Sequence, residues 1–226
     1  MTVQRHHHAR GLGLTSASMR SKLLNELRLS GIHNEKVLEV MGRIARHEFV
    51  EEAFSSEAYK NRSLPIGHAQ TISQPFIVAL MTQAALGAPG TAKPRRVLEV
   101  GTGSGYQTAV LADLVEAVFT VERIRPLTES ARQRLQRLGY RNVHFGYADG
   151  MQGWMPYAPY DAIVVTAAAQ TVPPSLPEQL ALGGRLVIPV GAGKAQKLLL
   201  IERHATYYSE TVLSDVTFVP LLAGRI

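Results

Sequence analysis

Hydrophobic residues recur along this chain with two different periods. Short continuous apolar runs alternate with longer stretches in which apolar residues return every three or four positions. Runs of the first kind predict buried β-strands, and the second spacing predicts amphipathic helices. The predicted strands cover residues 97–100, 118–121, 142–145, 160–165, 185–190, 197–202 and 216–221.

Helical stripes lie both between these strands and ahead of them. In 126–138 the residues Leu127, Ala131, Leu135 and Leu138 share one face, which predicts a helix packed on a sheet. Strand and helix alternate in this way through most of the chain. The pattern predicts an α/β fold with a Rossmann-like, doubly wound and mostly parallel sheet, covered by helices on both faces.

The chain before the first predicted strand is expected to contain helices and a flexible arm. From Ser18 a helical pattern begins, Gly31 ends it, and Asn34 is placed to cap a second helix. Residues 1–17 contain few large apolar side chains and predict a flexible arm. We therefore expect a single domain over 18–226. It consists of a helical segment over 18–90 and an α/β core over 91–226, with a proline- and glycine-rich linker at 89–94.

Composition narrows the class of protein. A chain of 226 residues with 46% hydrophobic content can bury a full core. The sequence has no cysteine, which excludes disulfides and thiolate nucleophiles. His6–His8 would suit a metal, but adjacent histidines in an arm are a weak signal, and we predict no metal site. No apolar run approaches the length of a membrane span, so a cytoplasmic protein is expected.

A net charge of +6 permits a nucleic-acid partner. The basic residues are scattered, however, and Arg132, Arg134 and Arg137 fall on the predicted solvated face of helix 126–138. We therefore expect neither a nucleic-acid nor a membrane partner, and a monomer.

The candidate chemistry lies at the glycine turn Gly101-Thr102-Gly103-Ser104-Gly105, between the strand 97–100 and a predicted helix. Glycine allows unusual backbone angles and close approach to a ligand. The next strand ends in Glu122, where α/β nucleotide sites place the acceptor for ribose hydroxyls. Gly101, Glu122, Asp149 and Thr166 all fall at the carboxyl ends of predicted strands, where ligands of such sheets bind.

The spacing of the turn separates two kinds of nucleotide site. A dinucleotide fingerprint reads G-x-G-x-x-G, whereas this chain reads G-x-G-x-G with the acidic Glu99 two positions earlier. E-x-G-x-G-x-G resembles the first motif of S-adenosylmethionine-dependent methyltransferases. A sulfonium cofactor also favours a nearby carboxylate. The expected cofactor is S-adenosylmethionine, with S-adenosylhomocysteine as product.

Further segments resemble one family within that class. Thr71-Ile72-Ser73-Gln74-Pro75, Asp161–Ala168 and the closing Phe218-Val219-Pro220-Leu221 are similar to the protein-L-isoaspartate O-methyltransferases, in the same order along the chain. The resemblance implies methyl transfer to the α-carboxylate of L-isoaspartyl residues in damaged proteins and peptides. The resulting ester closes to a succinimide that reopens partly to aspartate, which repairs the protein.

The resemblance also implies the residues of the site. Ser73 would be the active-site serine. The cofactor-binding set would be Ile72, Ser73, Gln74, Pro75, Glu99, Gly101, Thr102, Gly103, Gly105, Glu122, Arg123, Asp149, Gly150 and Thr166, with Asp149-Gly150 at the adenine. The substrate-binding set would be Leu64, Pro65, Val219, Pro220 and Leu221.

Two of these assignments have alternatives. Ser73 precedes a helical pattern, so its hydroxyl would suit a helix N-cap as well as an orienter of the substrate carboxylate. Pro220 cannot donate to a sheet ladder, so a strand containing it is expected at an edge. Neighbouring backbone groups would then be free to pair with an extended peptide, or the segment simply closes the core.

Two other functions remain open. Amino-directed nucleic-acid methyltransferases carry an N/D-P-P-Y-type motif after the fourth strand, where this chain reads Thr166-Ala167-Ala168-Ala169. The other alternative is a catalytically silent binding protein.

Overall fold

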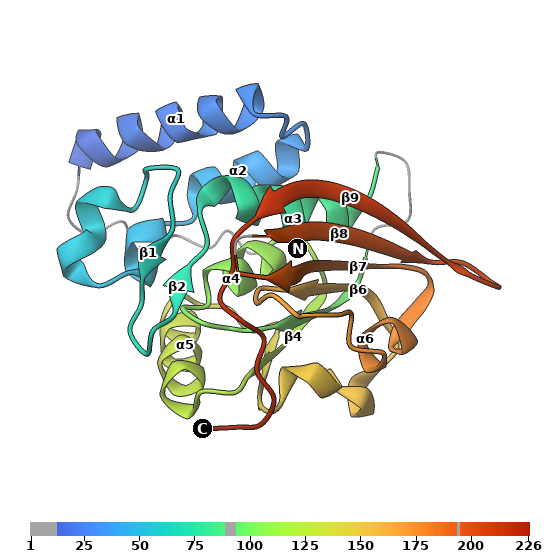
Figure 1. Cartoon of the computed structure of the whole chain (residues 1–226). Helices are drawn as coiled ribbons and strands as arrows, with labels where there is room; N and C mark the ends of the chain where they lie inside the picture. The colour runs from blue at the N-terminus through green and yellow to red at the C-terminus, as the bar shows by residue number, and fades with distance from the viewer. Residues whose placement is uncertain (1–12, 89–93, 194) are drawn as a thin grey trace.

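The computed structural model describes residues 13–88, 94–193 and 195–226, with side chains from Ala17 onward. The helices are α1 (Gly13–Leu29), α2 (Glu35–Arg43), α3 (Pro75–Leu86), α4 (Tyr106–Ala112), α5 (Arg125–Arg137) and α6 (Ser175–Glu178), with short 3-10 turns at Arg46–Phe49, Glu52–Glu57, Gly150–Gln152 and Met155–Tyr157 (Figure 1). The strands are β1 (Leu64–Pro65), β2 (Thr71–Ile72), β3 (Arg96–Val100), β4 (Ala117–Glu122), β5 (Val143–Tyr147), β6 (Tyr160–Val165), β7 (Leu180–Ala192), β8 (Ala195–Arg203) and β9 (Tyr208–Val216).

One seven-stranded sheet forms the centre of the molecule, in the order β5-β4-β3-β6-β7-β8-β9. The first five strands of that order run parallel, and β8 and β9 are antiparallel additions. The predicted α/β fold with a mostly parallel sheet is therefore confirmed. Because the order reverses between β3 and β6, the carboxyl ends of these strands flank a switch point, where such sheets bind ligands.

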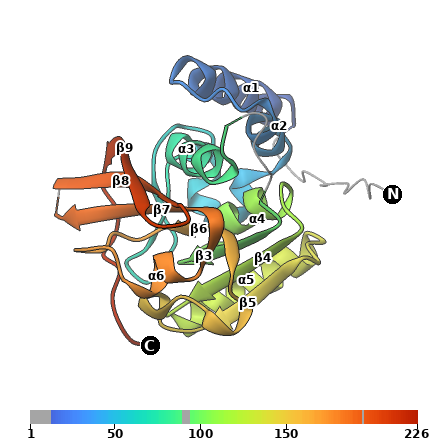
Figure 2. The same cartoon turned by 90° about the vertical axis from the view of Figure 1, so that its right-hand side faces the viewer.

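Successive residues of the strands face two different cores. Val97, Val118 and Ala162 pack in a cluster with buried residues of α1 to α4. Their neighbours Leu98, Phe119 and Ile163 pack in a second cluster with Leu176 of α6. This alternation is the period of a pleated strand. Helices α1, α2 and α3 stack on one side of the sheet (Figure 2).

The N-terminal segment follows its capping signals. The Asn34 side chain accepts hydrogen bonds from the amides of Lys36 and Val37 and so caps α2. Gly31, after α1, has φ +99°, a left-handed angle that favours glycine. Helix α1 begins at Gly13, inside the predicted arm 1–17, whereas residues 1–12 and the linker residues 89–93 lie outside the described part of the chain.

One strand prediction and one turn prediction were wrong in the C-terminal part of the sheet. The last strand is Tyr208–Val216, not 216–221; its residues are largely polar and exposed, so they form no apolar run. Residues 217–221 make only an isolated bridge, between Pro220 and Ala168. The predicted Gly183-Gly184 turn lies within β7, where the pairing with β6 shifts register and Gly183 has φ +74°.

None of the described helices is both long and apolar enough to cross a membrane.

Candidate active site

The glycine turn follows β3 directly and has an unusual backbone. Gly101, Gly103 and Gly105 have φ values of +96°, +52° and +86°, angles that side chains with a Cβ rarely adopt. A Cβ on Gly101 would also lie 2.4 Å from Thr166 Oγ1. The turn therefore brings bare backbone to the carboxyl edge of the sheet.

Glu122 holds this turn in place from the end of β4. Its Oε2 accepts a hydrogen bond from the Gly103 amide at 3.0 Å, and its Oε1 accepts one from the Ile124 amide at 3.0 Å. The residue is 7% exposed. Each carboxylate oxygen can accept a further hydrogen bond, so Glu122 can take a ligand's hydroxyl groups while it fixes the loop.

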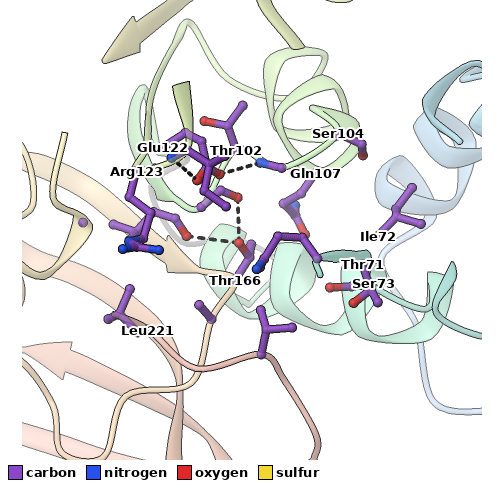
Figure 3. A pocket seen from close by; sticks show the side chains of 18 of the residues that line it. Thr71, Ile72, Ser73, Thr102, Ser104, Gln107, Glu122, Arg123, Thr166 and Leu221 are labelled. Atoms are coloured by element: carbon purple, nitrogen blue, oxygen red, sulfur yellow. Dashed lines mark hydrogen bonds between the residues drawn. The ribbon is translucent and has the colours of Figure 1, made fainter. Parts of the chain in front are cut away.

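A cavity opens at this edge of the sheet. In Figure 3, Glu122, Arg123 and Leu221 lie on one side, Thr71, Ile72 and Ser73 on the other, and Thr166 between them. The predicted residues that line it are Ile72, Ser73, Gly101, Thr102, Gly103, Glu122, Arg123, Gly150, Thr166, Val219, Pro220 and Leu221. The sequence interpretation missed further lining residues, among them Gln70, Thr71, Ser104, Gln107, Ala167 and Leu222.

A second cavity adjoins the first. It is lined by Ser63, Thr71, Ser73, Gln74, Ile77, Thr166, Asp215, Val216, Thr217, Phe218 and Val219. Thr71, Ser73, Thr166 and Val219 line both cavities. These shared residues mark the junction of the two cavities.

Ser73 is not the cap of the helix that follows it. Helix α3 starts at Pro75, its N-cap residue is Gln74, and no side chain caps it. Among the described residues, none forms a hydrogen bond with the Ser73 hydroxyl, which faces both cavities. The N-cap interpretation is therefore wrong, and the hydroxyl is available to a ligand.

The hairpin β1–β2 sets the position of Ser73. Leu64 pairs with Ile72, and Pro65 pairs with Thr71. Leu64 is buried, and neither it nor Pro65 lines either cavity. The two residues predicted to bind substrate thus support the strand that carries the cavity residues.

Glu99 lies behind the glycine turn and lines neither cavity. It is completely buried, and its Oε2 accepts hydrogen bonds from Thr108 and Thr120. Thr120 is in turn hydrogen-bonded to Thr102 of the turn, at 2.6 Å. Burial raises the pKa of Glu99 to about 8; the two threonine hydroxyls oppose that shift. Its predicted direct contact with a cofactor does not fit this position, because β3 carries its side chain into the interior.

Four other predicted cofactor residues also lie off the first cavity: Gln74, Pro75, Gly105 and Asp149. Gln74 lines only the second cavity, and Pro75 begins α3. Gly105 is the N-cap of α4, where an added Cβ would come within 3.1 Å of Leu135. Its left-handed φ of +86° and the packing of α4 on α5 both favour glycine there.

Asp149 lies at the end of β5, beside the cavity residue Gly150. Its Oδ1 accepts a hydrogen bond from the Met151 amide at 2.9 Å, and its Oδ2 accepts one from the Gly224 amide at 2.8 Å. The carboxylate is therefore held by two backbone amides, one of them remote in sequence.

The fold is that of a class I methyltransferase: a mostly parallel sheet with a glycine turn after β3, an acidic residue ending β4 and a cavity at their carboxyl ends. A sequence model of the protein-L-isoaspartate(D-aspartate) O-methyltransferase family matches residues 18–225. The chain belongs to this family.

Similar proteins agree with that membership. The chain is 55% identical over 213 residues to a protein-L-isoaspartate O-methyltransferase of Pseudomonas paraeruginosa, covering 94% of this chain and all of the relative. It is 50% identical over 222 residues to the enzyme of that name in Halorhodospira halophila, covering 98% of this chain and all of the relative.

Two solved structures share the fold. A protein-L-isoaspartate O-methyltransferase aligns with a TM-score of 0.79 at 30% identity, covering 89% of this chain and 65% of that one. A Plasmodium falciparum structure assigned to the same activity, in complex with S-adenosyl-L-homocysteine, aligns with a TM-score of 0.74 at 26% identity, covering 90% and 98% of the two chains.

Proposed function

We propose that this chain transfers the methyl group of S-adenosylmethionine to the α-carboxylate of L-isoaspartyl residues in damaged proteins and peptides, across the junction of its two cavities. The observation that carries the proposal is that Thr71, Ser73, Thr166 and Val219 line both cavities. Membership of the protein-L-isoaspartate(D-aspartate) O-methyltransferase family gives the reaction and its substrate class.

The residues of the first cavity fit the cofactor. Gly101 and Gly103 present backbone without a Cβ, and Glu122 offers acceptor capacity for ribose hydroxyls. When bound, S-adenosylmethionine supplies an electrophilic methyl group on a positively charged sulfur. In our proposal Glu122 holds the ribose, Asp149 and Gly150 lie at the adenine, and Thr102, Arg123 and Thr166 complete the wall.

In our proposal the second cavity takes the acceptor. A carboxylate is already ionised at pH 7, so its oxygen attacks the methyl carbon without a general base. The methyl group leaves the sulfur with no proton transferred, and the product sulfur is neutral. The work left to the protein is alignment and exclusion of water. Ser73 donates its hydroxyl to the carboxylate oxygen that does not react and so orients the other.

Methyl transfer to matched peptides tests this function. Purified protein with methyl-labelled S-adenosylmethionine is expected to label an isoaspartyl peptide and not the aspartyl peptide of the same sequence. The label should be released as methanol in mild base, because it is held as an ester. Transfer to RNA, or no transfer to either peptide, would contradict the proposal.

Ser73→Ala is expected to lower kcat/KM for an isoaspartyl peptide about tenfold or more, the effect of losing a hydrogen bond to a charged group. Affinity for S-adenosylhomocysteine and the melting temperature should stay close to the wild-type values, because Ser73 does not cap α3. Peptide kinetics, calorimetry and thermal unfolding measure the three quantities. The matched control is Ser130→Ala on the exposed side of α5. Unchanged peptide kinetics would remove Ser73 from the active site.

We also propose that the protein acts as a cytoplasmic monomer without a nucleic-acid partner. The scattered positive charge supports the lack of a nucleic-acid partner. Sedimentation of the purified protein tests the oligomeric state.

A further inference from the structure

The segment that follows β9 crosses the carboxyl edge of the sheet. It descends from β9 and ends at the start of α5 (Figure 1). Val219, Pro220, Leu221 and Leu222 line the first cavity from this segment. We call residues 219–226 the strap.

Backbone hydrogen bonds tie the strap to three strand ends. After β6, the Ala168 amide donates to Val219 O at 2.8 Å, and the Leu221 amide donates to Ala168 O at 2.7 Å. After β5, the Gly224 amide donates to Asp149 Oδ2. These bonds occupy Val219 O and the Leu221 amide, two of the backbone groups that the sequence predicts to be free for a substrate strand.

The third tie is at the end of β4. Arg123 Nε donates to Gly224 O at 3.1 Å, and the Ile226 amide donates to Arg123 O at 2.8 Å. The Arg125 amide donates to Ile226 O at 2.9 Å. The guanidinium of Arg225 also lies 5.3 Å from the centre of the Tyr147 ring. Polar and cation–π contacts thus fasten the far end of the strap.

Little apolar surface holds this end of the strap closed. Residues 222–226 are all exposed, with Leu222 at 49% and Ile226 at 64%. Segments fixed by exposed hydrogen bonds with few buried apolar contacts open locally at a low free-energy cost. The end of the strap, residues 222–226, can therefore open and close while the rest of the domain stays folded.

We infer that the strap is a working part of the cofactor site: closed, it positions the Asp149 carboxylate through the Gly224 amide and retains the nucleoside; open, it lets the nucleoside leave. The inference rests on the proposed function for the identity of the nucleoside. Gly224 is a positioning residue in this scheme, since it acts through Asp149. Cofactor exchange is then governed by strap opening.

Gly224→Ala tests the strap by backbone strain alone. Gly224 has φ +78°, and an added Cβ would meet no atom within 4 Å. Alanine at this angle disfavours the closed strap, so the dissociation rate constant of S-adenosylhomocysteine should rise roughly fivefold. Gly139→Ala is the matched control, because Gly139 has φ +84°, also meets no atom within 4 Å, and lies after α5. The control should lose stability without faster dissociation.

A shortened chain ending at Ala223 gives the larger effect. It lacks the Gly224 amide and the contacts to Arg123 and Arg125, so dissociation of S-adenosylhomocysteine, followed by surface plasmon resonance, should accelerate about tenfold or more. Dissociation rates equal to wild type in both the shortened chain and Gly224→Ala would overturn the inference. If the shortened chain does not fold, Gly224→Ala against Gly139→Ala decides alone.

The binding experiment uses S-adenosylhomocysteine without any methyl acceptor. In one outcome, the wild-type protein binds S-adenosylhomocysteine and the strap variants release it faster, but the wild-type protein labels no isoaspartyl peptide. That result would contradict the proposed function and support the inference about the strap. In the other outcome, the peptide is methylated and the strap variants release S-adenosylhomocysteine at the wild-type rate. That result would contradict the inference about the strap and support the proposed function.

Discussion

Glu122→Ala is expected to weaken S-adenosylmethionine binding by roughly 1.5–3 kcal/mol, the range for a hydrogen bond to a charged group. Two losses contribute. The variant removes the acceptor for ribose hydroxyls, and it leaves the amides of Gly103 and Ile124 without the carboxylate that orders the turn. Titration calorimetry with the wild-type and variant proteins measures the difference.

Two further variants make this result specific. Glu122→Gln retains one acceptor oxygen, so it can serve one of the two amides and should fall between wild type and alanine. Glu129→Ala, at an exposed position on α5, controls for loss of a carboxylate and should bind like wild type. Wild-type affinity in Glu122→Ala would show that the ribose lies elsewhere.

The second large effect concerns Glu99 and pH. Burial raises the pKa of Glu99 from an ordinary 4.5 to about 8, so the folded protein keeps this proton over a range in which the unfolded chain releases it. The stabilisation is complete below the unfolded pKa and is lost as pH rises through the folded pKa. Between those values it declines by about 1.4 kcal/mol per pH unit.

Glu99→Gln should remove this decline. Glutamine is neutral, and its side-chain oxygen can accept from Thr108 and Thr120 as the carboxyl does. From pH 5 to pH 8 the free energy of unfolding of the variant, minus that of the wild type, should therefore rise by about 3.5 kcal/mol. Urea unfolding of both proteins at several pH values gives this difference. The contributions of the other titrating groups to the free energy of unfolding are the same in both proteins and cancel.

Glu129→Gln is the control for the pH series, since Glu129 is exposed, and its curve should run parallel to that of wild type. A Glu99→Gln curve that also runs parallel to wild type would mean that Glu99 is ionised in the folded protein.

The parts of the fold with strong local signals were predictable. The inner parallel strands β3, β4 and β6 are buried on both faces and read as largely continuous apolar runs, as in residues 160–165. Asn34 is a residue type that commonly caps helices, and in the structure its side chain caps α2. The glycine turn and Glu122 were likewise found, because backbone conformation and strand position restrict the residues that fit there.

Elements set by tertiary context were not predictable. Strand β9 is an exposed antiparallel edge, so nothing in its own sequence marks it as a strand. The bond from Gly224 to Asp149 joins positions 75 residues apart, and no local pattern reports it. Glu99 looked like a cofactor ligand because its spacing fits the motif, whereas the direction of its side chain depends on the pleat of β3.

A structure of the protein with S-adenosylhomocysteine and an isoaspartyl peptide tests the central claim most directly. We expect the ribose hydroxyls at Glu122 in the first cavity and the peptide in the second, with its isoaspartyl carboxylate beside Ser73 and facing the sulfur. A nucleoside whose ribose lies away from Glu122, or a peptide bound outside the cavity lined by Ser73 and Thr217, would contradict the account.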